Sequence, residues 1–340
     1  MPIPNALRQT FQSNDTIVYA LSQYLNTTPR ALDEDFVRGF ARDCGLSVDE
    51  AFLTLLSAAC GLDTAENRWH RQLEQDYLRP GLHQLDPEVY RKDAYYQTVR
   101  LPAVRSGDWQ LCYSDYAPFE PFVCNHPILT ETLREIPQIG YFHQRFAFPA
   151  VLEKGVEWMT VTPNEIETMR VPIQKSHGQV VTLGLGLGYF AFHAAQKQEV
   201  TDVTVIERDS HVIELFRRYI LPQIPHGEKI RILQADAFVW LEQDFTSAEC
   251  DFLFADLWHD ASDGLDMYLR LRRILQKFPT LSVEYWIEPS LLSALRHMVY
   301  SKLIAPDAPA NLINADPYSL LSDSFLKRLA PDLRSVERKE

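Results

Sequence analysis

The sequence has few cysteines, no block of basic residues and no long apolar run, and each of these absences excludes a class of protein. The five cysteines are scattered, odd in number and never spaced as C-x-x-C: Cys44, Cys60, Cys112, Cys124 and Cys250. This pattern is typical of reduced thiols and argues against a disulfide framework or a cysteine zinc site. No span of about 20 apolar residues is present to cross a bilayer. The first residues lack a basic start followed by an apolar core, so we expect no signal peptide, a cytoplasmic location and no membrane partner.

The charge balance argues against nucleic acid as a partner. Asp and Glu number 46 and Lys and Arg 33, which gives a formal net charge of −13 over 340 residues. Binding to a phosphate backbone depends on clustered Lys and Arg, and no such cluster is present. A small neutral or cationic partner is easier to reconcile with the field of an acidic protein.

The most informative stretch is an apolar run that leads into three alternating glycines, Gly184, Gly186 and Gly188, within the sequence VVTLGLGLGYF. Glycines allow a positive φ and a close approach of the backbone to a ligand. The residues from Tyr189 to Gln196 are expected to form a helix, whose first free N–H groups favour a negative group. A dinucleotide fingerprint requires a further glycine at position 189, where this chain has Tyr189. The pattern therefore favours a mononucleoside cofactor.

Acidic residues follow three further β-branched or apolar runs, which we expect to be parallel strands. The runs and their acids are Asp202 to Glu207, Lys229 to Gln234 followed by Asp236 and Ala237, and Cys250 to Ala255 followed by Asp256. Glu207 ends the second strand of the series, where a carboxylate can accept both hydroxyls of a ribose. Asp209 stands just before the next helix and is expected to cap it.

The glycine loop, Glu207, Asp236 and Asp256 in this order resemble the class I S-adenosylmethionine-dependent methyltransferases, over roughly residues 176–289. The phrases VIERDSHVIELF and ADAFVWL resemble the branch that contains the spermidine synthases. The resemblance implies an α/β fold with a Rossmann-like doubly wound sheet and S-adenosylmethionine as cofactor. It assigns the three glycines to the methionine part of the cofactor, Glu207 to the ribose, Asp236 with Ala237 to the adenine, and Asp256 to the sulfonium and the acceptor.

Two departures from the spermidine synthases disfavour aminopropyl transfer. The acidic residue that engages the amine of the decarboxylated cofactor in those enzymes corresponds to Leu187 here. Their Tyr-His-Glu motif falls near Ile166, Glu167 and Thr168, which supply neither the tyrosine nor the acid in its place. We therefore expect methyl transfer to a small-molecule acceptor. Aminopropyl transfer from the decarboxylated cofactor and a cofactor-binding module without catalysis are the alternatives.

The segment DLWHD from Asp256 to Asp260 is the expected centre of the chemistry, because it leaves the carboxyl end of the fourth strand. Asp256 or His259 is the candidate base, and an exposed His259 bonded to Asp260 or Asp263 is the alternative for that residue. Trp258 is expected either to form a wall of the acceptor site or to pack in the core. The same segment resembles magnesium-dependent catechol-type methyltransferases. Only Glu284 and Glu288 are available as further oxygen ligands, so we expect no metal.

Three domains are expected: a helical domain over residues 1–94, a small antiparallel β region over 95–162 and the Rossmann-like domain over 163–340. The helical pattern covers Ile17 to Tyr24, Asp33 to Cys44, Val48 to Ala59 and Asn67 to Tyr77, and short strands are expected from about Tyr95 onward, including YQTVR and a run from Tyr141 to Phe148. Thr162, Pro163 and Glu165 predict the start of a helix, and Glu165 is also a candidate substrate contact.

The C-terminal part departs from the usual class I fold, which closes with an antiparallel hairpin. Residues Ser290 to Leu303 and Ser322 to Ala330 are predicted to be helical, so the hairpin is expected to be lost. A sheet of five strands then has an exposed edge. That edge must be covered by the tail, by the upstream domains or by a second subunit of a homo-oligomer.

Overall fold

A computed structural model describes residues 3–305 and 316–333 of the chain. Its α-helices are α1 (Asn5–Thr27), α2 (Glu34–Cys44), α3 (Val48–Ala59), α4 (Arg68–Leu73), α5 (Arg79–Gly81), α6 (Pro87–Arg91), α7 (Ala94–Thr98), α8 (Pro163–Lys175), α9 (Tyr189–Ala195), α10 (Ser210–Leu215), α11 (Ala237–Gln243), α12 (Ala261–Leu275), α13 (Glu288–Ile304), α15 (Pro317–Leu320) and α16 (Asp323–Leu329). Its strands are β1 (Leu82–Gln84), β2 (Val104–Ser106), β3 (Trp109–Tyr116), β4 (Phe122–Leu129), β5 (Glu135–Tyr141), β6 (Phe146–Glu153), β7 (Val156–Thr160), β8 (Gly178–Leu183), β9 (Val200–Glu207), β10 (Ile230–Gln234), β11 (Phe252–Ala255) and β12 (Ser282–Tyr285). Single turns of π-helix extend α4 over Glu74–Leu78 and α10 over Phe216–Ile220.

The chain forms two compact units, each assembled from three separate segments. Unit 1 contains residues 1–88, 115–147 and 296–325, and unit 2 contains residues 89–114, 148–295 and 326–340. The three domains predicted from the sequence are continuous segments, and their boundaries stay a prediction.

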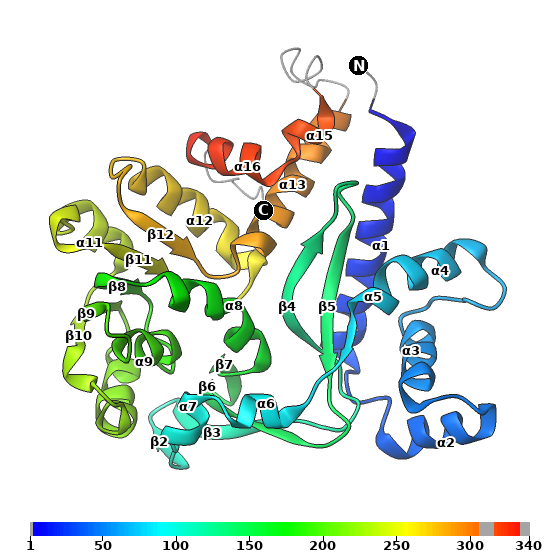
Figure 1. Ribbon diagram of the computed structural model, residues 1–340, viewed down its shortest axis with the longest axis horizontal. Helices are drawn as coiled ribbons and strands as arrows, with labels where there is room; N and C mark the ends of the chain where they lie inside the picture. Colours follow the sequence, from blue (N-terminus) through cyan, green and yellow to red (C-terminus); the bar gives the residue numbers. More distant parts are fainter. Residues whose placement is uncertain (1–2, 306–315, 334–340) are drawn as a thin grey trace. The chain divides into compact units, whose positions relative to one another are not determined.

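The centre of unit 2 is a five-stranded parallel sheet in the order β10-β9-β8-β11-β12. The order reverses at β8, which is paired with β9 on one side and with β11 on the other, as in doubly wound α/β folds. Helices α9 and α10 cover one face, and α11 and α12 cover the other (Figure 1). The predicted Rossmann-like fold is therefore confirmed.

The sheet is built from the apolar runs that the sequence indicates, because strands covered on both faces must be apolar throughout. Val203 and Val205 of β9 and Phe252 and Phe254 of β11 are fully buried. The described residues after β12 form helices α13, α15 and α16 and no further strand, as the predicted loss of the hairpin requires. Residues 306–315, part of the Pro- and Asp-rich stretch that follows α13 in the sequence, lie outside the described residues.

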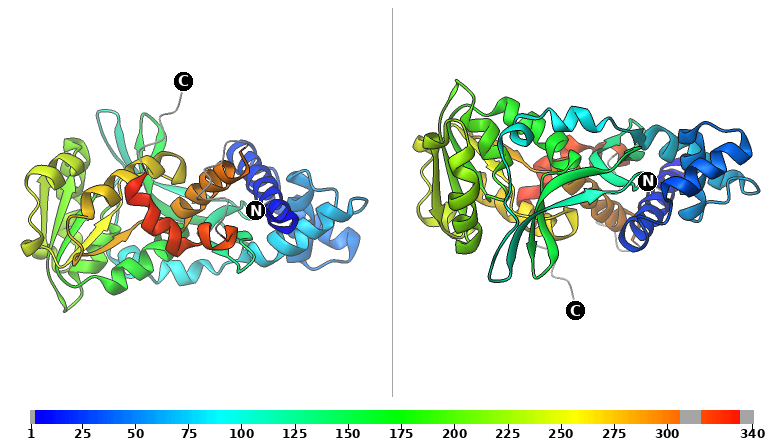
Figure 2. Two further views of the ribbon diagram at one scale, coloured as in Figure 1. Left: turned by 90° about the horizontal axis from the view of Figure 1, so that it is seen from above. Right: turned by 90° about the horizontal axis from the view of Figure 1, so that it is seen from below.

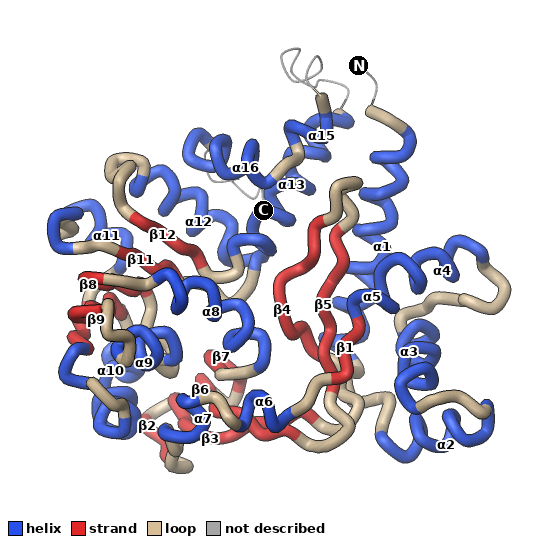
Figure 3. Tube along the Cα trace, in the orientation of Figure 1, coloured by secondary structure: helices blue, strands red, loops and turns tan. Residues whose placement is uncertain are grey.

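A second sheet, in the order β2-β3-β6-β7, runs through the aromatic part of the sequence (Figure 3). The predicted strand YQTVR was wrong, because Tyr96, Gln97 and Thr98 belong to helix α7. Asp93 caps this helix by accepting a hydrogen bond of 2.8 Å from the Tyr95 amide, and this local bond outweighs the strand preference of the aromatic residues. The predicted continuous run from Tyr141 to Phe148 was also wrong: β5 ends at Tyr141 and β6 begins at Phe146, in a different sheet.

The helices of unit 1 pack around a core of aliphatic and aromatic side chains, with a small sheet in the order β1-β5-β4. The four predicted helices are present. The first is much longer than predicted and extends over Asn5–Thr27, and the fourth continues from α4 into the π turn. Ser47 caps α3 by accepting from the Glu50 amide, whereas the Glu50 carboxylate binds Arg79 instead of closing the capping box. Among the described residues, no helix combines the length and the apolar character needed to cross a membrane.

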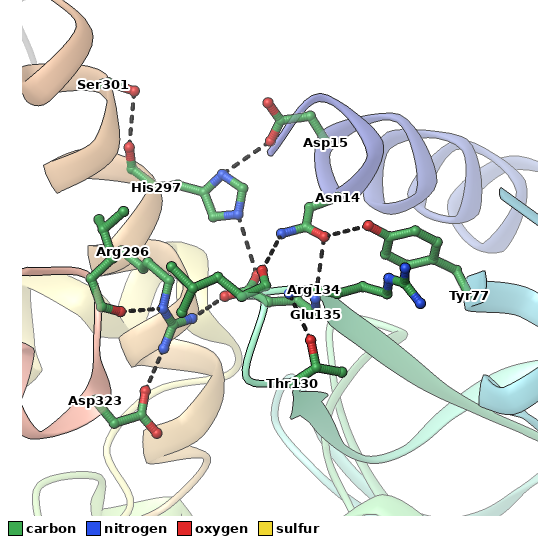
Figure 4. A network of polar contacts seen from close by, with 12 residues as sticks. Asn14, Asp15, Tyr77, Thr130, Arg134, Glu135, Arg296, His297, Ser301 and Asp323 are labelled. Atoms are coloured by element: carbon green, nitrogen blue, oxygen red, sulfur yellow. Dashed lines mark hydrogen bonds and ion pairs between the residues drawn. The ribbon is translucent and has the colours of Figure 1, made fainter. Parts of the chain in front are cut away.

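A buried polar network holds α1, β5 and the C-terminal part of α13 together within unit 1 (Figure 4). The side chains of Arg296 and Glu135 are 2% and 3% exposed and form an ion pair, and Arg296 also binds Asp323 and the Leu321 carbonyl. His297 lies between Glu135, at 3.3 Å, and Asp15 of α1, at 3.0 Å. The two helices lie side by side (Figure 2), where the rings of Phe11 and Tyr300 stack with centroids 3.8 Å apart.

Candidate functional site

A cavity of about 480 Å³ lies within unit 2, a size typical of small-molecule sites. Its floor is formed by the residues that follow β8, β9, β10 and β11, at the carboxyl edge of the parallel sheet, where folds of this class bind ligands. Residues 157–161, which include the end of β7, form the opposite wall, together with Glu153 of β6 and Trp109 of β3.

The structure brings nine of the ten predicted site residues to this one cavity: Gly184, Gly186, Glu207, Asp236, Ala237, Asp256, Trp258, His259 and Glu165. Gly188 is not among the described residues that line it; it caps α9 from a left-handed conformation. Which part of a cofactor or substrate each residue contacts stays a prediction.

The glycine loop is shaped by the surrounding protein as well as by any ligand. Gly184 has a φ of +96°, and a Cβ atom there would lie 1.9 Å from the carbonyl oxygen of Asp256. Gly188 has a φ of +73°, and a Cβ atom there would lie 2.2 Å from the ring of Phe216. A side chain at either position would meet both the steric cost of a positive φ and an occupied neighbour. The loop can therefore approach β11 closely and deliver its backbone to the cavity.

The Glu207 carboxylate is held in place by two backbone amides. Its Oε2 accepts from the Leu185 amide at 3.1 Å, and its Oε1 accepts from the Asp209 amide at 2.8 Å. Each carboxylate oxygen has a second lone pair, so two ligand hydroxyls can still be accepted. Glu207 thus links the glycine loop to the end of β9 and keeps acceptor capacity toward the cavity.

Two of the strand-end aspartates cap the helices that follow them. Asp209 accepts from the amides of His211 and Val212 at the start of α10, as predicted. Asp236 caps α11 through one oxygen, Oδ1, which accepts from Phe238 and Val239 at 2.9 and 3.0 Å. Because Asp236 also lines the cavity, the capping role and the predicted adenine contact are compatible.

The pKa of the Asp256 carboxyl group is strongly altered by its surroundings. Burial, together with the nearby charges of Glu165 and Glu207, raises its pKa to about 8. A carboxyl group whose pKa lies near the working pH can remove a proton from a nucleophile, which an ordinary aspartate does poorly. Asp256 follows β11 directly, and its amide is fixed by a 2.9 Å bond to the Leu183 carbonyl.

Glu165 has the structural role that the sequence predicts and also faces the cavity. Its carboxylate accepts from the Thr162 amide at 2.7 Å, from the Thr162 hydroxyl, and from the Thr160 hydroxyl at 3.1 Å. Burial raises its pKa, although these hydrogen bonds oppose the shift. Glu165 therefore adds a fixed acidic group close to Asp256.

The loop after Asp256 contains two further candidate residues, Trp258 and His259, which differ in their exposure to solvent. Trp258 is buried, donates from Nε1 to the Trp286 carbonyl at 3.2 Å and packs against Gly264, so it serves both the core and the cavity wall. His259 is exposed, and its Nδ1 lies 3.1 Å from Asp263, which was the alternative expected for it. The ring of His259 also meets Trp158 edge-on, with centroids 4.4 Å apart.

The residues considered as extra metal ligands are engaged elsewhere. Glu284 forms an ion pair of 2.5 Å with Lys175. Glu288 lies outside the fifth strand, because β12 stops at Tyr285 and Glu288 begins α13. There it accepts from the Tyr268 hydroxyl at 2.8 Å and pairs with Lys327 at 2.5 Å.

The sequence did not identify most of the opposite wall of the cavity. Among its residues are Trp109, Glu153, Glu157 and Met159, and Arg208 follows Glu207 on the floor. Alternation along β6 and β7 indicated strands but not which of their faces meets a cavity. With these residues included, seven carboxylates line the cavity: Glu153, Glu157, Glu165, Glu207, Asp209, Asp236 and Asp256. Of the described lining residues only Arg208 is an arginine or lysine, so the cavity favours cationic ligands.

Comparisons with known proteins return the two groups of enzymes that the sequence motifs resemble. No family model matches the chain, and no curated protein matches it. Among solved structures, spermidine synthase from Thermotoga maritima is 17% identical and covers 41% of this chain and 50% of its own, with a TM-score of 0.30. A spermidine synthase in complex with the transition state analogue AdoDATO is 18% identical over 41% of this chain and 49% of its own (TM-score 0.29). The S-adenosylmethionine-dependent methyltransferase SibL, in its apo form, is 19% identical over 30% of this chain and 29% of its own (TM-score 0.23).

The chain thus spans about half the length of the spermidine synthases that it matches. Because these similarities are low, we base the proposed function on the residues of the cavity.

Proposed function

We propose that the protein is an S-adenosylmethionine-dependent methyltransferase that acts on a small-molecule acceptor, neutral or cationic. The observation that carries this proposal is the convergence of the glycine loop, Glu207 and the high-pKa carboxyl of Asp256 on one acidic cavity. The loop supplies bare backbone, Glu207 supplies acceptors for a ribose, and the carboxylates supply a favourable field for a sulfonium cation.

The residues present fit such a cofactor. Glu207 would hold the ribose, Asp236 and Ala237 the adenine, and Gly184 and Gly186 the methionine part. When bound, S-adenosylmethionine supplies a methyl group activated by the positive sulfonium. The protein contributes alignment of the acceptor with that group, since an in-line displacement depends mainly on positioning.

Asp256 is assigned the proton transfer. Its carboxylate would accept the proton of the acceptor's nucleophilic atom, and the bound cofactor would supply the methyl group, with the electron pair of the broken carbon–sulfur bond left on sulfur. The proton on Asp256 then returns to water. The exposed His259, bound to Asp263, is the second candidate for this role.

Aminopropyl transfer from decarboxylated S-adenosylmethionine is the second candidate function. The excess of acidic over basic side chains in the cavity favours it, because the decarboxylated cofactor carries an amine without a balancing carboxylate. Leu187 argues against it, since an apolar side chain lines the cavity where the resemblance places the acid that engages this amine.

Titration calorimetry with S-adenosylmethionine, its decarboxylated form and S-adenosylhomocysteine tests the proposal. We expect S-adenosylmethionine and S-adenosylhomocysteine to bind. A preference for the decarboxylated form would replace methyl transfer by aminopropyl transfer, and no binding of any of the three would favour a degenerate module without catalysis. A screen of metabolite extracts for incorporation of labelled methyl groups would then identify the acceptor.

A further inference from the structure

The glycine loop is tied to a short helix that does not itself line the described cavity wall. Helix α7 (Ala94–Thr98) lies between α6 and β2 in the sequence, and its residues were expected to be a strand. The Tyr95 side chain is fully buried, and its hydroxyl donates a 2.7 Å hydrogen bond to the Leu187 carbonyl, inside the glycine loop.

The residue that caps α7 reaches the same loop from its other end. Asp93 Oδ1 accepts from the Tyr95 amide, and Asp93 Oδ2 accepts from the Tyr189 hydroxyl at 2.9 Å. Tyr189 is the first residue of α9 and replaces the glycine of a dinucleotide fingerprint. His193, one turn further along α9, lies 3.4 Å from Asp93 and helps to lower the pKa of that carboxyl against the opposing effect of burial.

The next residue of α7, Tyr96, binds the segment that forms the opposite wall of the cavity. The Tyr96 hydroxyl donates to the Val161 carbonyl, immediately before the Thr162 cap of α8. Val161 lines the cavity, and α8 carries Glu165. Consecutive side chains of one short helix therefore bind both the glycine loop and the start of α8.

A loop with three glycines needs such support. Glycine has more backbone freedom to lose than any other residue, so a glycine loop that orders only on binding would lose affinity to that entropy cost. Bonds that fix the loop before the ligand arrives remove this cost. The bond from Tyr95 also satisfies the Leu187 carbonyl in the middle of the loop.

We propose that Asp93, Tyr95 and Tyr96, here called the α7 clamp, are positioning residues that preset the glycine loop and the α8 wall for cofactor binding. This inference rests on the proposed function for its ligand but not for its geometry. The clamp acts through Leu187, Tyr189 and Val161 and does not touch the cofactor.

The test uses Tyr95→Phe, which removes one hydroxyl and keeps the ring. Tyr77→Phe is the matched control, because Tyr77 is a buried tyrosine of unit 1 whose hydroxyl donates to Asn14 at 2.8 Å, outside the cavity. We expect Tyr95→Phe to raise the dissociation constant of S-adenosylmethionine about fivefold to tenfold, the loss expected for one buried hydrogen bond. Tyr77→Phe should lower the melting temperature and leave that constant unchanged.

Hydrogen exchange of the ligand-free proteins provides a readout that does not depend on the cofactor. The amides of Gly184, Leu185 and Gly188 all bond within or beside the loop, and we expect their exchange to be about tenfold faster in Tyr95→Phe and unchanged in Tyr77→Phe. If the wild type binds no sulfonium nucleoside, the proposed function fails, while the exchange rates still decide whether the clamp exists.

Wild-type affinity together with wild-type exchange in Tyr95→Phe would overturn the proposal and leave Tyr95 as an ordinary core residue. Faster exchange with unchanged affinity would equally refute a role in cofactor binding. If Tyr95→Phe does not fold, Tyr96→Phe takes its place, with weaker affinity expected because the α8 wall loses its bond at Val161.

Discussion

The raised pKa of Asp256 suits the residue to proton transfer and makes folding stability depend on pH. A half-buried carboxyl group that is flanked by Glu165 and Glu207 stays protonated to about pH 8, whereas in the unfolded chain it loses its proton near pH 4. Between these values the folded state holds more protons than the unfolded state. Folding stability from this group is therefore fully present below about pH 4 and is lost as the pH rises through 8.

Substitution Asp256→Asn removes this dependence. We expect the variant and the wild type to be equally stable at pH 4, and the variant to be more stable at pH 9 by about 1–3 kcal/mol, less than the full shift implies because water in the open cavity screens the charge. Urea denaturation at the two pH values measures the difference. A variant that is less stable than the wild type at pH 9 would show that the ionised carboxylate is not costly.

The proposed ribose contact of Glu207 can be tested by removing its side chain. Glu207→Ala is expected to weaken affinity for S-adenosylmethionine by about 1.5–3 kcal/mol, the range for lost hydrogen bonds to a charged group. Calorimetry measures the change, and circular dichroism checks that the fold is retained. An unchanged affinity would remove Glu207 from the ribose site.

At the scale of the element, the turn between β8 and α9 tolerates no side chain at its first glycine. Gly184→Ala combines a positive φ with a Cβ atom 1.9 Å from a backbone oxygen that cannot move aside, so we expect a loss of about 3 kcal/mol or more. Gly155 is a matched control, because its φ is +83° and no atom lies within 4 Å of its added Cβ. Gly155→Ala should cost about 1 kcal/mol, the backbone term alone. Thermal denaturation of both variants separates the two contributions, and equal losses would contradict the close approach of the loop to β11.

Sequence patterns predicted the elements whose signals are local. The buried strands β8 to β11 and the caps at Thr162 and Asp209 follow from apolar runs and from side chains within three residues of a helix start. Tyr96 was predicted to lie in a strand because the pattern YQTVR is compatible with both a strand and a short helix. The cap from Asp93 favours the helix. The cavity wall at Glu153 and Glu157 was not predictable, because it depends on which face of a separate sheet meets the loop.

At the scale of the whole molecule, both units lose stability as the pH rises above neutral, for independent reasons. In unit 1, burial acts against protonation of His297, but the bond to Glu135 and the charges of Glu135 and Asp15 raise its pKa above the ordinary value of 6.5. The contribution of His297 to folding stability is present below pH 6.5 and is lost as the pH rises through the raised pKa. Below neutral, burial lowers the pKa of His126 to about 4 and so reduces stability as the pH falls from 6.5.

We therefore expect stability to fall as the pH rises from 6 to 9. The double substitution Asp256→Asn with His297→Gln should flatten this alkaline decline, and each single change should flatten it in part. The effect is measured as the free energy of unfolding between pH 6 and pH 9, with one spectroscopic probe placed in each unit to monitor denaturation. His177→Gln serves as a control because His177 is exposed and lies outside the network of Figure 4. A decline that persists unchanged in the double variant would assign it to other groups.

The ion pair between Glu135 and Arg296 has a consequence for synthesis on the ribosome. The two residues are separated by 161 positions, and most of unit 2 is encoded between them. At ordinary rates of translation, roughly 10–30 s pass between the synthesis of Glu135 and that of Arg296. A carboxylate destined for a dry interior must stay hydrated during that interval. Unit 1 is therefore complete only after the strands of the parallel sheet have been synthesised, because its last segment, residues 296–325, follows them in the sequence.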